Sequence, residues 1–562
     1  MNKKNYISQL LPVILVIGLA IVINMLSSYF HIAFDLTGDK RFTMTKPTHK
    51  LLNDVKDVVF INVLLEGDLP AGVKRLQNSV KEILDDFHAI NPNVEYTFVN
   101  PNVGTVEEIN KARTELAKDG IYPTNLRVKG SDETREILFY TYATVTYGGR
   151  TKVVNLVDKK GGVLDELTIN NSISLLEFKF ASAIQKVMQF GQKHIAFLNG
   201  HGELTLPQTA DLRQTLRSSY NVGTFNLDST YIIPKEIEML IIAKPRFRFS
   251  EKHKFMIDQY IMNGGKVIWL LDRIGVNLDS LYRNPRFMPT DLPLNLDDQL
   301  FKYGARVQPN LVLDLQCTKI ELAVDREGTK DLFDWYYHPV IIPKSDHPVV
   351  KGLDGVNLYF PSRIDTIKTK TNIKKTILLA SSEYSREQFL PIELNFEILR
   401  YKPLPEKFNK PHIPIGVMLE GRFPSLYEAR VTQDMRKSLE EINSPFKKIS
   451  PPNKMLVVAD GDIAKNLISP KDGAPVPLGY NRWVGYTFAN KAFLVNAIEY
   501  MLDETGIIEA RTKEVKLRLL DKVKAKKEAI KWQIINILVP LLLLGLFGFI
   551  FNWRRKRKYA KG

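Results

Sequence analysis

Cysteine is nearly absent from the sequence. Cys317 is the single cysteine among 562 residues, so an intrachain disulfide and a zinc site built from cysteine thiolates are both excluded. Redox chemistry of the Cys-x-x-Cys type is excluded for the same reason. A low cysteine content is typical both of a reducing cytosol and of a bacterial envelope protein that avoids mispairing, so it leaves the cellular compartment open.

Motifs that carry catalysis are missing as well. Neither Cys nor Ser lies in a G-x-C/S-x-G elbow, the strained turn that presents a nucleophile in glutaminase-like enzymes. Gly264-Gly265-Lys266 is not a phosphate loop, because Val267 follows the lysine where Ser or Thr is needed. His338 and His347 are neighbours only in sequence. The sequence therefore predicts no enzyme, no cofactor and no metal site.

Two long apolar runs are present, one near each terminus. Residues 532–551 carry no charge over 20 positions and have aromatic residues at both ends, so they are long enough to cross ~30 Å of hydrocarbon as a helix. Residues 7–30 contain a second run, which is apolar from Ile7 to Leu26 except for Ser8, Gln9 and Asn24. Two transmembrane helices are predicted, with roughly 500 residues of water-soluble character between them.

The net charge of +16 gathers around the second apolar run. Residues 511–531 hold nine Lys or Arg against three acids, and residues 552–562 hold six more with no acid. Basic residues beside a membrane span meet anionic headgroups, so this pattern favours lipid or partner contact over nucleic acid. The residues expected to face the membrane or a partner are Arg511, Lys516, Arg518, Lys522, Lys524, Lys526, Lys527, Arg554, Arg555, Lys556, Arg557 and Lys558.

The orientation follows from the charges next to the spans. Lys3, Lys4 and the run 554–558 place both termini in the cytoplasm by the positive-inside rule. The basic segment 511–531 opposes this, but long loops translocate largely regardless of their charge. We expect two spans in the inner membrane, with cytoplasmic termini and a large periplasmic domain.

The region 31–170 alternates strands and helices. Strands are predicted at 58–65 and 94–99 and helices at 73–90 and 105–118, followed by a third strand ending at Val128. A strand over 137–147 should form a hairpin with 151–156 across two glycines. This order resembles a thioredoxin-like unit, with Pro123 where that fold has a cis-proline.

The region 171–505 predicts a second α/β unit that begins with a helix at 172–190. Short apolar strands alternate with amphipathic helices, which implies a parallel, doubly wound sheet. The expected strands are 194–198, 222–226, 239–243 and 266–271, and the expected helices are 208–220 and 250–262. Further strands of the same or an adjoining sheet are expected at 377–380, 415–419 and 455–459, and a helix at 490–502. A basic helical stalk at 506–531 leads to the span 532–551 and the tail 552–562.

One turn stands out as a candidate ligand site. Asn199, Gly200, His201, Gly202 and Glu203 follow a predicted strand, at the end where open α/β sheets bind ligands. It is not the dinucleotide fingerprint, because Thr205 occupies the third glycine position. The alternative is a tight strand-to-helix turn in which the polar side chains satisfy local backbone groups.

Three aspartates also follow predicted strands. Asp272, Asp460 and Asp462 would converge at one sheet edge, where carboxylates can bind a cation or another polar ligand. Aspartates in such positions more often cap the next helix. Both interpretations stay open at the level of the sequence.

The order of these segments resembles a known family. The segments that carry the resemblance are FDLTGDKRFTMT, VNP at 99–101, FLNGHGE, LIIAKP, GGKVIWLLD, VVADGDIAKN, LGYNRW and the stretch from Phe488 to Lys524. Together with the two spans they resemble the gliding-motility-associated auxiliary (GldG) family of ABC transporter proteins from Bacteroidota. The resemblance extends over essentially the whole chain.

The resemblance implies an auxiliary, substrate-binding-like subunit that associates with the permease and ATPase of an ABC transporter. Such transporters are linked to gliding motility and cell-envelope secretion. The periplasmic sheet would be similar to class I glutamine amidotransferases without their catalytic cysteine. The periplasmic region would present a ligand or couple the complex mechanically, and a homodimer in the complex is compatible with this. The alternative is a peptide-, glycan- or lipid-binding scaffold that acts without a transporter.

Overall fold

A computed structural model describes most of the chain between the two predicted spans. The described residues are 18–19, 43–129, 134–157, 166–189, 191–284, 286–325, 327–441, 444–512 and 528–559. The chain divides into two compact units, residues 1–513 and residues 514–562. The predicted first span at 7–30 lies outside the described residues, apart from 18–19. The stalk residues 513–527 also lie outside them, and they include Lys516, Arg518, Lys522, Lys524, Lys526 and Lys527.

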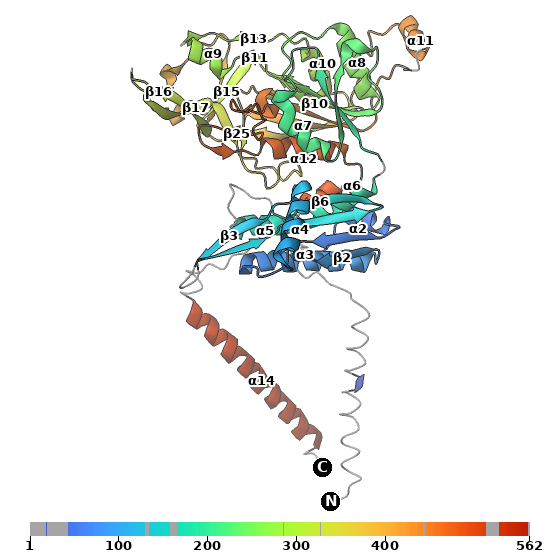
Figure 1. Cartoon of the computed structure of the whole chain (residues 1–562), viewed down its shortest axis with the longest axis vertical. Coiled ribbons are helices and arrows are strands. Elements are labelled where there is room, and N and C mark those ends of the chain that lie inside the picture. The colour runs from blue at the N-terminus through green and yellow to red at the C-terminus, as the bar shows by residue number, and fades with distance from the viewer. Residues whose placement is uncertain are drawn as a thin grey trace, which may run out of the picture. The chain divides into compact units, whose positions relative to one another are not determined.

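Residues 43–189 form a small lobe around a four-stranded sheet (Figure 1). The sheet order is β2-β1-β5-β6, in which β1 and β2 are parallel and β5 is antiparallel to both β1 and β6. β3 and β4 form a separate two-stranded sheet. The elements are α2 (Lys46–Asn53), β1 (Val59–Val63), α3 (Ala71–Ile90), β2 (Val94–Phe98), α4 (Val106–Lys118), β3 (Thr124–Lys129), β4 (Thr134–Phe139), β5 (Tyr142–Tyr147), β6 (Arg150–Asn155), α5 (Glu166–Ser174) and α6 (Leu176–Met188).

The local sequence explains where these elements begin and end. In α3 the apolar residues recur every three or four positions, so one stripe of the helix packs into the core. α4 begins at a capping box, in which the Thr105 side chain accepts from the Glu108 amide and the Glu108 side chain accepts from the Thr105 amide. The hairpin between β5 and β6 turns on Gly148 and Gly149, both with positive φ.

Three details of the small lobe differ from the sequence prediction. The strand predicted at 137–147 is two strands, because β4 pairs with β3 whereas β5 pairs with β1. The helix predicted at 172–190 is interrupted at Leu175 between α5 and α6. The cis peptide bond among the described residues is Leu390–Pro391, so Pro123 is not a cis-proline.

The large lobe, residues 191–505, is built on a seven-stranded sheet. Its order is β20-β23-β24-β10-β9-β7-β8. The five strands from β24 to β8 are parallel, as predicted, and β23 runs antiparallel to both of its neighbours. The strands are β7 (His194–Asn199), β8 (Asn221–Asn226), β9 (Ile237–Ala243), β10 (Lys266–Leu270), β20 (Ile373–Ala380), β23 (Pro414–Gly421) and β24 (Asn453–Val458).

Helices cover both faces of this sheet, which is the doubly wound arrangement. Successive residues of a strand point to opposite faces, so Ile268 packs in the core with α7 (Ala210–Arg217) and α12 (Asn490–Leu502). Trp269 packs on the other face with α8 (Glu251–Met262) and α10 (Asp297–Tyr303). The predicted helix at 208–220 is shorter, because it starts as the turn η1 (Pro207–Thr209) and ends at Arg217.

An aromatic insertion between β10 and β23 was not predicted. Its core holds Trp335, Tyr336, Tyr337, Phe360 and Phe408. Its short sheets are formed by β11 (Ile274–Gly275), β12 (Arg286–Phe287), β13 (Thr290–Asp291), β14 (Ala305–Val307), β15 (Asn310–Asp314), β16 (Cys317–Ala323), β17 (Lys330–Ile341), β18 (Val356–Asn357), β19 (Ile364–Thr366), β21 (Ser385–Phe389) and β22 (Leu394–Asn395). Short connecting elements are η2 (Leu227–Ser229), α9 (Leu278–Arg283), η3 (Phe396–Leu399), η4 (Pro405–Lys407), α11 (Gln433–Glu441), η5 (Asp462–Ala464), β25 (Tyr480–Asn481), β26 (Tyr486–Thr487) and η6 (Ile507–Thr512).

The second unit contains one long helix, α14 (Ala529–Tyr559). It includes the predicted span 532–551 and continues through the basic run Arg554–Lys558. By length and composition it is the one helix of the described residues that could cross a membrane, and none of its apolar window is buried. Its 31 residues correspond to about 46 Å, more than the hydrocarbon thickness.

Candidate functional site

The candidate site lies at the carboxyl edge of the seven-stranded sheet. β7, β9, β10 and β24 are parallel neighbours, so the loops that follow them meet at one edge. These loops carry the turn 199–203, Lys244, Asp272 and the segment 460–462. This is the edge at which open α/β sheets bind ligands.

The turn 199–203 is stabilised from within. Gly200 and Gly202 have φ values of 124° and 75°, in the region that favours glycine. The His201 carbonyl accepts hydrogen bonds from the Arg246 and Phe247 amides, and the Glu203 carboxylate accepts one from the His201 amide at 2.7 Å. Backbone groups of this turn and one carboxylate oxygen of Glu203 are thus engaged in local hydrogen bonds.

The His201 side chain extends this arrangement into a chain of polar groups that runs from the buried His201 to the exposed Asp228. Its ring stacks on Phe249 at 3.8 Å, and its Nε2 lies 2.9 Å from Nδ1 of His253. His253 Nε2 in turn lies 3.0 Å from Asp228 Oδ1. Burial, and next the nearby His201, lower the pKa of His253.

The three predicted aspartates do converge, and a lysine lies among them. Carboxylate oxygens of Asp272, Asp460 and Asp462 lie within 4.8 Å of one another. Lys244 Nζ is 2.8 Å from Asp272 and donates a hydrogen bond to Asp462. Its ammonium group thus takes the place that a cation would occupy among the carboxylates.

The backbone holds this lysine in place. Lys244 has φ of 55°, an unusual conformation for a residue with a side chain. A Cβ on Gly461 would lie 2.7 Å from the Lys244 Cβ, so only glycine fits beside it. The Gly461 amide donates to Asp272 at 2.5 Å.

The three carboxyl groups differ in the direction in which their surroundings shift the pKa. Burial favours the neutral form of Asp460 and raises its pKa well above its usual range. Burial also raises the pKa of Asp272, whereas the Lys244 ammonium overcomes burial and lowers that of Asp462. Burial alone would lower the pKa of Lys244, but Asp272 and Asp462 outweigh it and raise that pKa.

A cavity of about 190 Å³ opens beside Asp462 at this edge. Tyr359, Phe360 and Trp483 contribute aromatic walls, and His338 and Asn481 contribute buried polar groups. Both ring nitrogens of His338 and Nδ2 of Asn481 have no hydrogen-bond partner among the described residues. Burial lowers the pKa of His338 to about 3, so its ring is neutral at pH 7.

The structure thus separates the predicted site residues into two groups. Asp462 lines the cavity, whereas Asp272, Asp460 and the turn 199–203 do not appear among its lining residues. The sequence analysis missed Asn481 and Trp483 as site residues, although both belong to the LGYNRW segment that carries the family resemblance. His338 lies in a dense aromatic run, WYYHP, which was the available signal.

Comparison with known families identifies the large lobe. A family model described as "ABC-type uncharacterized transport system" matches residues 192–497, more than half of the chain. The chain belongs to this family. It is an auxiliary protein of an ABC-type transport system. A second model, for a domain of unknown function, matches residues 38–146 in the small lobe.

Individual relatives add little to this assignment. An uncharacterized protein of Borreliella burgdorferi is 24% identical over 449 residues, which cover 77% of this chain and 81% of the relative. Among solved structures, the mmIFT52 N-terminal domain aligns at 13% identity with a TM-score of 0.32, covering 55% of this chain and 96% of that domain. An exo-β-1,4-mannosidase from Opitutaceae bacterium strain TAV5 aligns at 11% identity with a TM-score of 0.22, covering 61% of this chain and 40% of the enzyme. Scores this low support no conclusion about this chain.

Proposed function

We propose that this auxiliary protein is a non-catalytic, membrane-anchored subunit that works with the permease and ATPase of its transporter. The family assignment of residues 192–497 is the observation that carries this proposal. α14 supports it, because an apolar helix followed by five consecutive basic residues, 554–558, suits a membrane anchor with anionic lipid at its end.

The chemistry of the sheet edge supports a role without catalysis. Lys244 is held between two carboxylates, and Glu203 is bound to the backbone of its own turn. The Lys244 ammonium group, held between two carboxylates, is not available to transfer a proton to a substrate. The edge therefore serves to shape and stabilise the loops around the cavity.

The finer assignments remain part of the proposal. For the topology, we propose a second span at 7–30, a place in the inner membrane, cytoplasmic termini and a periplasmic position for both lobes. The proposed domain limits are 31–170, 171–505 and 506–531. The proposed biological role is in gliding motility and envelope secretion in Bacteroidota. A thioredoxin-like small lobe is supported by its β2-β1-β5-β6 order, with one parallel and two antiparallel pairs. Five parallel strands with helices on both faces support the amidotransferase-like large lobe. A homodimer within the complex belongs to the same proposal.

Extraction of the tagged full-length protein from its native membrane tests the proposal. We expect mild detergent to recover the permease and ATPase in fixed ratio, as seen by mass spectrometry. A matched variant replaces residues 532–551 with an unrelated apolar helix of equal length, which separates anchoring from docking. Loss of the permease from that variant would place the docking surface on α14, and retention would place it on the lobes.

Recovery of the wild-type protein alone, under conditions that keep other transporter complexes intact, would contradict the transporter role. The alternative function, a binding scaffold that acts without a transporter, would then be favoured. The cavity beside Asp462 is the observation that supports this alternative, because it offers unpaired polar groups to a ligand.

A further inference from the structure

The cavity beside Asp462 carries an inference that does not depend on the transporter role. It lies between the loop after β24, the aromatic insertion and the segment 477–490. Its polar groups come from all three parts: the partly buried Asp462 and the buried His338 and Asn481. Three separate segments of the chain therefore bring polar atoms to one small volume.

These polar atoms are costly unless something binds them. His338 and Asn481 are each 1% exposed, and a buried polar group without a partner costs about 1–3 kcal/mol. The side-chain oxygen of Asn481, Oδ1, already accepts hydrogen bonds from the Trp483 and Val484 amides. Its Nδ2 is the side-chain atom that remains without a partner among the described residues, and Asn481 lines the cavity.

The available groups define a pattern of donors and acceptors. Asn481 offers a donor, and the neutral ring of His338 offers one donor and one acceptor. Asp462 Oδ1 accepts no hydrogen bond from the described residues and lies 3.6 Å from Lys465 Nζ. A complementary ligand must therefore present both an acceptor and a donor.

The walls restrict the shape and charge of that ligand. Tyr359, Phe360 and Trp483 give the cavity flat apolar surfaces, which favour a planar group. Asp279 and Asp462 bring negative charge to the cavity and Lys465 and Arg482 bring positive charge, so neither an anion nor a cation is favoured by net charge. A volume of about 190 Å³ limits the ligand to a small molecule or the end of a longer one.

We propose that this cavity binds a planar amide group, with the amide carbonyl facing Asn481 and the amide N–H facing His338 or Asp462. An amide is a small planar group that carries an acceptor and a donor side by side. The group belongs either to a small free molecule or to the end of a peptide. The cavity is then a recognition site at the sheet edge, and the carboxylate–lysine cluster behind it positions Asp462.

Ligand-observed NMR on the detergent-solubilised full chain tests the proposal with three probes of one shape. Benzamide carries the amide, acetophenone replaces its NH₂ with a methyl group, and benzoate replaces it with an anion. We expect saturable binding of benzamide that is at least about tenfold tighter than binding of acetophenone or benzoate. This comparison needs no variant, so a folding defect cannot confuse it.

Two variants then locate the binding. Asn481→Ala and His338→Phe should each weaken benzamide binding by about tenfold or more. His347→Phe is the matched control, because His347 is a half-buried histidine that packs against Tyr500 and does not line the cavity. Acetyl-phenylalanine amide distinguishes the two sources, since tighter binding than benzamide indicates a peptide end and weaker binding indicates a small free molecule.

Three results would overturn the proposal. Equal binding of benzamide and acetophenone would show that the polar atoms of the cavity do not recognise the amide NH₂ group. Tighter binding of benzoate would make the cavity an anion site. No saturable binding of any probe up to about 10 mM would show that water satisfies these atoms. None of these results bears on whether the permease copurifies.

Discussion

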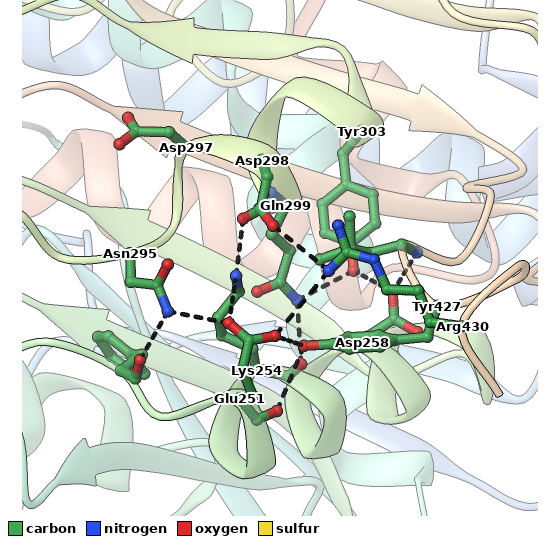
Figure 2. Close-up of polar contacts among 12 residues, drawn as sticks. Glu251, Lys254, Asp258, Asn295, Asp297, Asp298, Gln299, Tyr303, Tyr427 and Arg430 are labelled. Atoms are coloured by element: carbon green, nitrogen blue, oxygen red, sulfur yellow. Dashed lines mark hydrogen bonds and ion pairs between the residues drawn. The ribbon is translucent and has the colours of Figure 1, made fainter.

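Asp258 lies at the centre of a buried polar network in the large lobe (Figure 2). It is fully buried on α8, and its carboxylate accepts hydrogen bonds from Ser425 Oγ at 2.6 Å, the Leu426 amide at 2.8 Å and Tyr303 OH at 2.8 Å. Lys254, one turn earlier, is also fully buried and bonds Asp298 at 2.7 Å. One carboxylate therefore joins α8, α10 and the segment 425–430.

Replacement of Asp258 should destabilise the large lobe strongly. Asp258→Ala leaves several buried donors without an acceptor, so we expect the free energy of unfolding to fall by about 3–5 kcal/mol. Denaturant unfolding followed by tryptophan fluorescence measures this. Asp331→Ala on the exposed start of β17 is the control, with an expected change below about 0.5 kcal/mol. Similar midpoints for the two variants would contradict the network's role.

His338 should make stability depend on pH. Burial, opposed only by Asp462, lowers its pKa from 6.5 in the unfolded chain to about 3 in the folded one. The unfolded chain therefore binds the extra proton between these values, so stability is full above pH 6.5 and is lost as the pH falls toward 3. Between pH 7 and pH 5 this amounts to about 2 kcal/mol, at 1.36 kcal/mol for each pKa unit.

The variant His338→Phe isolates this contribution, since it keeps an aromatic ring but removes the titrating group. Unfolding in denaturant at pH 7 and pH 5 should show a loss about 2 kcal/mol larger in the wild type than in the variant. The same loss in both proteins would mean that another group is responsible.

At the scale of elements, the loops after β9, β10 and β24 are joined by one ammonium group. Lys244 follows β9, Asp272 follows β10, and Asp462 follows β24. Because the strands are parallel neighbours, their loops are brought together whatever side chains they carry. The attraction between the Lys244 ammonium and the two carboxylates then stabilises this edge of the sheet.

Removal of that ammonium group should convert the cluster into a cation site. Lys244→Met leaves three carboxylates together, so we expect a loss of about 3–5 kcal/mol in stability. About 5 mM calcium should restore part of this loss, because carboxylate oxygens are the ligands that calcium prefers. Thermal unfolding with and without calcium measures both effects.

Lys465→Met is the control for this experiment. Lys465 is partly exposed and lies 3.6 Å from Asp462, so its removal should cost below about 1 kcal/mol and give no calcium response. A calcium response of equal size in the wild type would show that the lysine does not compete with a cation.

At the scale of the whole molecule, the two lobes are linked by the chain beyond α12. Ile507, Ile508 and Ala510 of η6 follow the large lobe in sequence, yet they pack in the core of the small lobe with α6. An ion pair adds to this link, because Lys186 of α6 lies 2.6 Å from Glu499 of α12. The small lobe is therefore incomplete without residues that follow the large lobe in sequence.

Disruption of η6 should therefore loosen the small lobe. Ile507→Asp places a charge at a position that is 1% exposed, so we expect a loss of about 3–5 kcal/mol in small-lobe stability. Hydrogen exchange should accelerate in α3 and α6 while α8 keeps its protection. Val484→Asp, at a side chain that is 39% exposed, is the control. Uniform acceleration in both lobes would show that they unfold as one body.

Elements whose signal is local could be predicted from the sequence. The helices expected at 73–90, 105–118 and 490–502 and the apolar helix at 532–551 depend on residues a few positions apart, and the structure has a helix at each place. The parallel strands β7, β9, β10 and β24 were equally visible, because both of their faces are largely buried and their sequences are mostly apolar.

The contacts between residues far apart in the chain could not be predicted in this way. Lys244 is ordinary in sequence, and its position among Asp272, Asp460 and Asp462 arises because β9, β10 and β24 are parallel neighbours. The cavity depends on His338 and Asn481, which are far apart in the chain and meet only after the aromatic insertion has packed on the sheet edge. Strand order and the packing of inserted segments are long-range properties, and local periodicity carries no information about them.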